Sequence, residues 1–396
     1  MTDHSSSNSP SVSNTSPTIH WMENDSPQSA LWRSENGSPP PKHVVLADDT
    51  LNADAAYRLA CEGTALLWRG DYQNARQLLQ ALGRRIDKKP KKNKMATAPV
   101  SAKDAFNLHR QAQAQRARVL GMLLLPLNMD HSIPLRRAPD VHAACFEAYG
   151  TADADAVVSL REMLGLIGAH EWRKKGVDVP ATGGRIHPYY GVFSPVRGEY
   201  IELVAQAPLP SKTQAFDIGT GTGVLAAVLA KRGVQHIVAT DLNPRALDCA
   251  LENMNRLGFA YQVELKQTDL FPEGRAPLIV CNPPWLPARP NAAIEHALYD
   301  FNSQMLQGFL NGLQQHLTDD GEAWLILSDL AEHLGLRTRE ELLGWFAHAG
   351  VKIIARHDAR PKHGKAFDKD DPLHQARSKE ITSLWRLSLE CDDTSL

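Results

Sequence analysis

Short β-type runs alternate with helical stretches between residues 211 and 389, and this alternation restricts the fold more than any other feature. Strands that are separated by helices predict an α/β fold with an open, mostly parallel sheet and helices on both faces. The clearest helix is expected near 297–317, where large apolar residues repeat along one face. The seven runs are 213–218, 236–240, 263–266, 278–281, 323–327, 351–355 and 381–389.

The first 42 residues have a composition that is typical of disorder. They are rich in Ser and end in three prolines, Pro39 to Pro41. Such a segment buries too little apolar surface to offset the entropy that it loses on folding. We expect a disordered tail over 1–42, in which Trp21 and Trp32 are exposed.

Residues 43–180 predict a mainly helical N-terminal domain, a candidate for substrate recognition. Apolar residues recur at three- and four-residue steps over 56–67 and 75–82, and further helices are expected near 103–125 and 153–168. A basic linker, 84–103, interrupts this domain. Its first part, 84–94, carries seven positive residues, which suit either a solvated linker or contact with a phosphate backbone.

Composition excludes several classes of protein. Of 396 residues, 43% are hydrophobic and 22% charged, which is unlike collagen or a wholly disordered chain. Five scattered cysteines form no CxxC pair, which favours a reducing compartment. The longest apolar run, near 119–127, contains Pro126 and is too short to span a membrane. We therefore expect a cytoplasmic protein, and the net charge of −2 requires any nucleic-acid binding to use a local patch.

The first β-type run leads into a glycine-rich loop, Asp217-Ile218-Gly219-Thr220-Gly221-Thr222-Gly223. Glycines allow a sharp turn after a strand and let a ligand approach the backbone. Position 224 is Val where a dinucleotide fingerprint requires Gly, and the Lys of a P-loop is absent. The loop therefore predicts a nucleotide-type cofactor, and a tight structural turn is the alternative.

Two carboxylates follow the next two strands. Asp241 ends the second run, at a place where a carboxylate accepts hydrogen bonds from ribose hydroxyls. Asp269 follows the third run, where it is placed to accept from an adenine amino group between Leu242 and Leu270. An ordinary loop aspartate explains Asp269 equally well when it is considered alone.

The fourth strand ends in Asn282-Pro283-Pro284-Trp285. Two prolines cannot extend a strand ladder, so the strand ends and presents Asn282 at the carboxyl edge of the sheet. This box suits an amino group that is conjugated to a π-system. The side-chain oxygen of Asn282 and the carbonyl of Pro283 would accept its two N–H bonds, and Trp285 would stack on the planar substrate. A proline-rich turn with a core tryptophan is the alternative.

In this order on successive strands, the motifs resemble the class I S-adenosylmethionine-dependent methyltransferases, which implies a Rossmann-like domain over 181–396. The Asn-Pro-Pro-aromatic box narrows the resemblance to enzymes that methylate amino or amide nitrogens. Residues 190–199, Tyr-Gly-Val-Phe-Ser-Pro-Val-Arg-Gly-Glu, resemble the approach segment of the "methyltransferase small" group. That group includes release-factor glutamine methyltransferases and ribosomal-RNA methyltransferases. The resemblance covers about 185–390, and Trp285 departs from the more usual Tyr or Phe.

The resemblance implies S-adenosylmethionine as the cofactor, direct transfer of its methyl group and no metal. The residues expected to bind the cofactor are Asp217, Gly219, Thr220, Gly221, Gly223, Asp241, Leu242, Asp269, Leu270 and Asn282. The expected catalytic residues are Asn282, Pro283 and Trp285. The expected substrate contacts are Phe193, Arg197 and Trp285.

The expected substrate is a macromolecule, either a nucleobase in RNA or a glutamine amide of a release factor or ribosomal protein. Basic residues in 84–94 and 356–379 favour RNA slightly. His357, His363 and His374 match no metal-ligand spacing. A catalytically silent methyltransferase fold that serves as a binding or scaffold protein is the alternative function, and the intact glycine loop and Asn282 argue against it.

Overall fold

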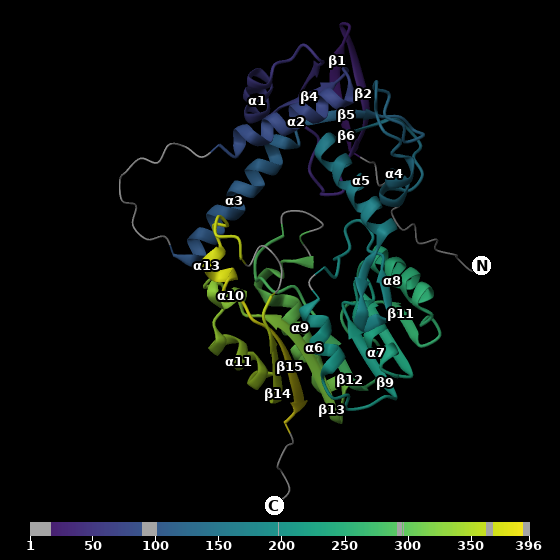
Figure 1. The fold of residues 1–396 in the computed structure, drawn as a ribbon, viewed down its shortest axis with the longest axis vertical. Helices are drawn as coiled ribbons and strands as arrows, with labels where there is room; N and C mark the ends of the chain where they lie inside the picture. The colour runs from purple at the N-terminus through teal and green to yellow at the C-terminus, as the bar shows by residue number, and fades with distance from the viewer. Residues whose placement is uncertain are drawn as a thin grey trace, which may run out of the picture. The chain divides into compact units, whose positions relative to one another are not determined.

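The computed structural model describes residues 17–88, 101–196, 198–290, 295, 297–361 and 367–390 (Figure 1). The chain divides into two compact units that are interleaved in sequence. The first unit takes its residues from 1–88, 118–142 and 149–163, and the second from 89–117, 143–148 and 164–396. The linear boundaries expected at 42 and 180 do not capture this interleaving. No helix within the described ranges is both long and apolar enough to cross a membrane.

The second unit is built on a seven-stranded sheet with the order β11-β10-β9-β12-β13-β15-β14. The strands are β9 (Gln214–Ile218), β10 (His236–Asp241), β11 (Val263–Gln267), β12 (Ala276–Cys281), β13 (Leu317–Ser328), β14 (Val351–Ala359) and β15 (Thr382–Leu389). β9 to β13 pair in parallel, and β15 is antiparallel to β13 and β14. Each predicted run corresponds to one strand, and the Rossmann-like fold is confirmed. The strand order reverses between β9 and β12, the place where such sheets bind ligands.

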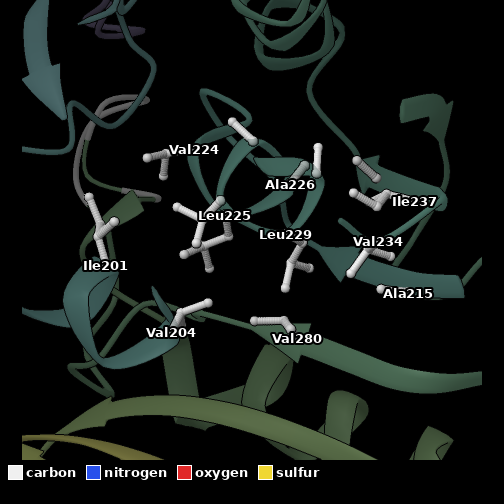
Figure 2. Close-up of a cluster of buried hydrophobic side chains, with 14 of the residues drawn as sticks. Ile201, Val204, Ala215, Val224, Leu225, Ala226, Leu229, Val234, Ile237 and Val280 are labelled. Atoms are coloured by element: carbon white, nitrogen blue, oxygen red, sulfur yellow. The ribbon is translucent and has the colours of Figure 1, made fainter. Parts of the chain in front are cut away.

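Helices pack on both faces of this sheet. The helices of the second unit that follow β8 are α6 (Glu199–Gln206), α7 (Val224–Lys231), α8 (Pro244–Leu257), α9 (Gln304–His316), α10 (Leu330–His333), α11 (Arg339–His348) and α13 (His374–Arg377). Side chains of α6 and α7 pack with Val280 on one face (Figure 2), and side chains of α9 and α11 pack with Ile279 and Cys281 on the other. Successive strand residues point to opposite faces, so β12 is buried on both sides.

The helix predicted near 297–317 begins later than expected. α9 starts at Gln304, because Asn302 and Ser303 both have a φ of 55°, which is not helical. The carboxylate of Asp300 accepts hydrogen bonds from the backbone N–H groups of Met305 (3.0 Å) and Leu306 (3.1 Å), which lie in the first turn. This cap replaces the turn of helix that the apolar pattern predicted.

The first unit contains a six-stranded sheet with the order β1-β2-β6-β5-β4-β3. Its strands are β1 (Thr18–Glu23), β2 (Ser26–Arg33), β3 (His43–Ala47), β4 (Thr64–Trp68), β5 (Leu123–Leu127) and β6 (Ala156–Ser159). Its helices are α1 (Ala53–Glu62) and α2 (Tyr72–Ile86). Three helices run through both units: α3 (Ala102–Leu120), α4 (His142–Tyr149) and α5 (Leu160–Lys175). A short hairpin, β7 (Val177–Val179) and β8 (Gly184–Ile186), belongs to the second unit.

The disordered tail expected over 1–42 is wrong for residues 18–33. A two-residue turn, Asn24 and Asp25, joins β1 to β2, and both residues have positive φ, as a type I′ hairpin requires. Ile19 and Trp32 are buried against Leu67 of the sheet. Composition alone missed this hairpin, and residues 1–16 lie outside the described part of the chain.

The mainly helical domain expected over 43–180 is also corrected. Helices lie near the predicted positions, but the prediction missed the sheet. Part of the range 56–67 is β4, and part of the range 153–168 is β6, so α1 ends at Glu62 and α5 begins only at Leu160. β4 and β5 are short apolar runs that are buried on both faces, and such runs show no alternation that would mark a strand. Of the basic stretch 84–94, residues 89–94 lie outside the described residues.

Candidate active site

A cavity of about 1760 Å³ opens at the carboxyl ends of β9, β10 and β12, within the second unit. It lies where the strand order reverses. Eleven of the residues predicted from the sequence line it: Phe193, Gly219, Thr220, Gly221, Asp241, Leu242, Asp269, Leu270, Asn282, Pro283 and Trp285. Asp217 and Gly223 are not among its described lining residues, and Arg197 lies outside the described residues.

The glycines of the loop have two different functions. Gly219, Gly221 and Gly223 all have positive φ, of 71°, 55° and 78°, which side chains disfavour. Gly219 and Gly221 expose their backbone to the cavity. A Cβ on Gly223 would lie 3.2 Å from the Cβ of Ala250, so this glycine permits close packing against α8.

Asp217 supports the glycine loop from a buried position. Its carboxylate is 1% exposed and accepts hydrogen bonds from the Thr220 hydroxyl (2.7 Å) and the backbone N–H of Ala226 (3.1 Å). Burial raises the pKa of Asp217 to about 6, against the lowering effect of these two bonds. The predicted contact between Asp217 and the cofactor is therefore replaced by a structural function: this carboxylate holds Thr220 and the first turn of α7.

Asp241 reaches the cavity from the end of β10. One carboxylate oxygen accepts from the backbone N–H of Gly221 (3.0 Å), and the other accepts from that of Asn243 (2.9 Å). Burial raises its pKa, and hydrogen bonds from these backbone groups oppose that shift. A carboxylate fixed at both oxygens has a defined position beside the glycine loop, and it has more acceptor sites than the backbone N–H groups of Asn243, Gly221 and Leu242 occupy.

Leu242 and Leu270 line the cavity next to Asp269. Leu242 is 62% exposed, which leaves its side chain available to a planar ligand. Leu270 has a φ of 62°, and its carbonyl accepts a hydrogen bond of 2.6 Å from the Thr240 hydroxyl. The structure thus brings together the residues expected at the adenine end.

Asn282 follows β12 and shares the cavity with the glycine loop. Its Oδ1 accepts a hydrogen bond of 2.9 Å from the indole Nε1 of Trp285. The Trp285 ring also packs against the hydrophobic clusters on both faces of the sheet. The sequence predicted the aromatic face of Trp285, but the bond to Asn282 depends on two side-chain conformations that no sequence pattern specifies.

Sequence reasoning missed the contribution of the first half of α3. Phe106, His109 and Gln113 line the cavity. Phe106 is 2% exposed and packs in a cluster with Leu334 and Leu373. The helical spacing near 103–125 was visible, but spacing within a helix does not show what the helix packs against.

A second anchor of α3 is Arg110. Its guanidinium lies 4.2 Å from the centre of the Tyr299 ring and donates a hydrogen bond of 2.7 Å to the carbonyl of Arg289. Tyr299 and Arg289 themselves line the cavity. This helix therefore forms part of the cavity wall, together with Arg289 and Tyr299.

Two of the basic residues predicted to contact RNA are ion-paired. Arg356 contacts Asp358 at 2.7 Å, and Arg377 contacts Asp371 at 2.9 Å. Arg377 lines the cavity, and His363 lies outside the described residues.

A strand–glycine loop–helix at the switch point, with a carboxylate after the next strand and an Asn-Pro-Pro box after the fourth, defines a class I S-adenosylmethionine-dependent methyltransferase. Residues 186–348 match the family model of the methyltransferase small domain. A tRNA1(Val) (adenine(37)-N6)-methyltransferase of Pectobacterium carotovorum is 31% identical over 176 residues, which are 41% of this chain and 68% of that protein. The chain belongs to this methyltransferase small-domain family.

Other similar proteins cover different shares of the chain. A release factor glutamine methyltransferase of Cereibacter sphaeroides is 48% identical over 102 residues, which are 25% of this chain and 36% of that protein. The chain therefore spans about a third of that relative. A solved S-adenosylmethionine-dependent methyltransferase of Geobacter sulfurreducens, in complex with S-adenosylhomocysteine, is 15% identical with a TM-score of 0.34, over 54% of this chain and 96% of that one.

The lining residues fit S-adenosylmethionine. A Cβ on Gly221 would point into open space, whereas a Cβ on Gly219 would lie 2.6 Å from Cε of Met305, so the absence of a side chain at Gly219 keeps its backbone accessible. The fixed carboxylate of Asp241 suits ribose hydroxyls, and Asp269 and the two leucines suit adenine.

Proposed function

We propose that this protein transfers a methyl group from S-adenosylmethionine to a planar amide or amino nitrogen of a macromolecule. The observation that carries the proposal is the common cavity of Asn282, Pro283 and the Gly219–Thr222 loop. A cofactor held by that loop and a nitrogen held by Asn282 would occupy one continuous space. Binding two reactants in one oriented site is a main source of rate enhancement in transfer reactions.

Asn282 and Pro283 are proposed to hold the target nitrogen. The Oδ1 of Asn282 has two acceptor sites, of which the Trp285 N–H takes one. The second site and the carbonyl of Pro283 are proposed to accept the two N–H bonds of the substrate. These bonds would turn the nitrogen lone pair out of conjugation and aim it across the cavity. Trp285 would support the flat face of the substrate.

When it is bound, S-adenosylmethionine supplies an electrophilic methyl group. The chain's own contribution is to position the groups and to exclude water. Asp241 and the Gly219–Thr222 backbone line the cavity with polar groups, and Phe106, Leu334 and Leu373 add an apolar cluster to its lining.

The substrate class has two candidates among macromolecules. One relative is named for a glutamine of a release factor and the other for an adenine of tRNA. Both targets are planar nitrogens, which suits the acceptors described above. The basic segments 84–94 and 356–379 are proposed as RNA contacts, although Arg356 and Arg377 already have acidic partners.

A filter assay with radiolabelled cofactor tests the proposal. Ribosomes, tRNA and release factors are offered separately, and Asn282→Ala serves as the matched inactive variant. Label that enters one of these substrates with the wild type and not with the variant supports methyl transfer. Cofactor binding without label in any fraction would favour the scaffold alternative.

A further inference from the structure

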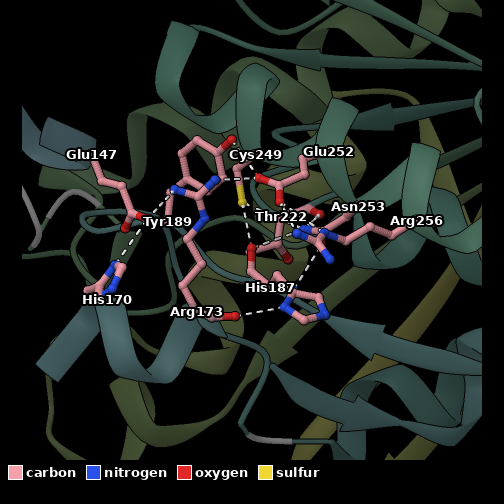
Figure 3. Close-up of polar contacts among 10 residues, drawn as sticks. All are labelled: Glu147, His170, Arg173, His187, Tyr189, Thr222, Cys249, Glu252, Asn253 and Arg256. Atoms are coloured by element: carbon pink, nitrogen blue, oxygen red, sulfur yellow. Dashed lines mark hydrogen bonds and ion pairs between the residues drawn. The ribbon is translucent and has the colours of Figure 1, made fainter. Parts of the chain in front are cut away.

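A buried polar network joins the glycine loop to the segment that precedes α6 (Figure 3). At its centre is Asn253 of α8, which is 0% exposed. Its Oδ1 accepts a hydrogen bond of 2.8 Å from the backbone N–H of His187, and its Nδ2 donates one of 3.0 Å to the carbonyl of Thr222. Asn253 is not among the described residues that line the cavity, but Thr222 is.

The neighbouring residue, Glu252, holds the same segment at a second point. Its carboxylate accepts from the hydroxyl of Tyr189 at 2.7 Å and from the guanidinium of Arg173 at 2.5 Å. That guanidinium also lies 3.8 Å from the centre of the Tyr189 ring. Burial would raise the pKa of Glu252, but hydrogen bonds from Tyr189, Arg256 and Arg173 lower it to about 2, so it is ionised at neutral pH.

These contacts fix two walls of the cavity at once. The chain leaves His187 and Tyr189 and reaches Gly191, Val192 and Phe193, which line the cavity. Thr222 belongs to the glycine loop, which also lines the cavity. One side chain on α8 therefore fixes the distance between two segments that each face the ligand space.

We propose that Asn253 is a positioning residue for the cofactor, which locks the glycine loop and the 187–193 segment in the arrangement that binds S-adenosylmethionine. This inference rests on the proposed function. The carboxamide fits because it offers an acceptor at one end and a donor at the other. A carboxylate would lack the donor for the Thr222 carbonyl, and a leucine would leave both backbone groups unpaired in a buried place.

The test measures the affinity of the full-length protein for S-adenosylhomocysteine by calorimetry. The variants are Asn253→Leu and Asn253→Asp, which keep roughly the size and shape of the side chain. The control is Asn255→Ala, which removes an exposed amide from the same helix. All four proteins are measured at a temperature well below the melting temperature of the least stable one, so that loss of fold does not enter the result.

We expect both Asn253 variants to bind about tenfold or more weakly. In Asn253→Leu, the His187 N–H and the Thr222 carbonyl both lose their partner, whereas in Asn253→Asp only the Thr222 carbonyl loses its donor and faces a carboxylate instead. Asn255→Ala should bind like the wild type. If the Asn253 variants are folded and bind S-adenosylhomocysteine within twofold of the wild type, the inference is overturned and the proposed function stays intact. If Asn253→Leu does not fold, Asn253→Asp decides alone. A wild type that binds no S-adenosylhomocysteine would overturn the proposed function and this inference with it.

Discussion

The indole Nε1 of Trp285 donates a hydrogen bond of 2.9 Å to Oδ1 of Asn282. The side-chain nitrogen of Asn282 can only donate a hydrogen bond, so it cannot pair with the indole N–H. The indole N–H therefore requires the oxygen of the Asn282 amide to face it. Trp285 thus orients the oxygen on which the proposed chemistry depends, besides offering an aromatic face. A Phe at this position would keep the face and lose the donor.

This relationship separates two substitutions of Trp285. Trp285→Phe should retain substantial activity, with the apparent KM nearly unchanged and kcat reduced about two- to tenfold, the usual effect of one neutral hydrogen bond. Trp285→Ala should in addition raise the apparent KM, because stacking acts on the bound ground state. Steady-state kinetics on the substrate found in the filter assay measure both. Equal kcat for Trp285→Phe and wild type would show that the indole N–H has no orienting effect.

Asp241→Ala should weaken the binding of S-adenosylhomocysteine by about 1.5–3 kcal/mol, because it removes an acceptor for charge-assisted hydrogen bonds. It also frees the backbone N–H groups of Gly221 and Asn243. Calorimetry gives the change directly. Unchanged affinity would remove Asp241 from the cofactor site.

The buried carboxyl of Asp217 predicts a specific pH dependence of stability. Its pKa rises from 3.8 to about 6 in the folded protein, so the stability it contributes is full below pH 3.8 and is lost as the pH rises through about 6. Asp217→Asn keeps acceptors for Thr220 and Ala226 but does not titrate. The free energy of unfolding of the wild type, minus that of the variant, should fall by about 3 kcal/mol between pH 3.8 and pH 8. Denaturant unfolding at several pH values checks this, and a flat difference would contradict it.

The first unit offers a test of the corrected N-terminus. Ile19 of β1 is 1% exposed, whereas Met22 of the same strand is 60% exposed. Ile19→Ala should lower the free energy of unfolding by about 2–5 kcal/mol, and Met22→Ala should change it by less than about 0.5 kcal/mol. A matched pair of denaturation curves measures the difference. If both variants unfolded like the wild type, β1 would not belong to the folded sheet.

The sequence predicted those parts of the fold that are determined by residues close to one another in the chain. Each strand of the seven-stranded sheet is a β-type run, and Gly219 and Gly221 mark the sharp turn after β9, where both have positive φ. Asn282 was identified because two prolines must end a strand. In each case, the feature follows from the conformational preferences of residues that are adjacent in sequence.

The missed features depend on residues that are distant in sequence. Asp217 resembles a ligand contact until its bonds to Thr220 and Ala226 are known. His109 lines the cavity from a helix that is anchored by Phe106, in a cluster with Leu373, and by Arg110, which contacts Tyr299. The Asn24–Asp25 turn was in principle readable, but the Ser-rich composition around it suggested disorder.

The most direct test of the account is methyl transfer by Asn282→Ala, measured beside cofactor binding and melting temperature. Asn282 follows a strand whose packing uses Ile279, Val280 and Cys281, so the fold should survive its truncation. We predict unchanged melting temperature and S-adenosylhomocysteine affinity within a few-fold of wild type. The rate of transfer should fall on the order of a hundredfold or more, because the oxygen that orients the target nitrogen is gone. Turnover at the wild-type rate would contradict the assignment of Asn282 as the residue that positions the methylated nitrogen.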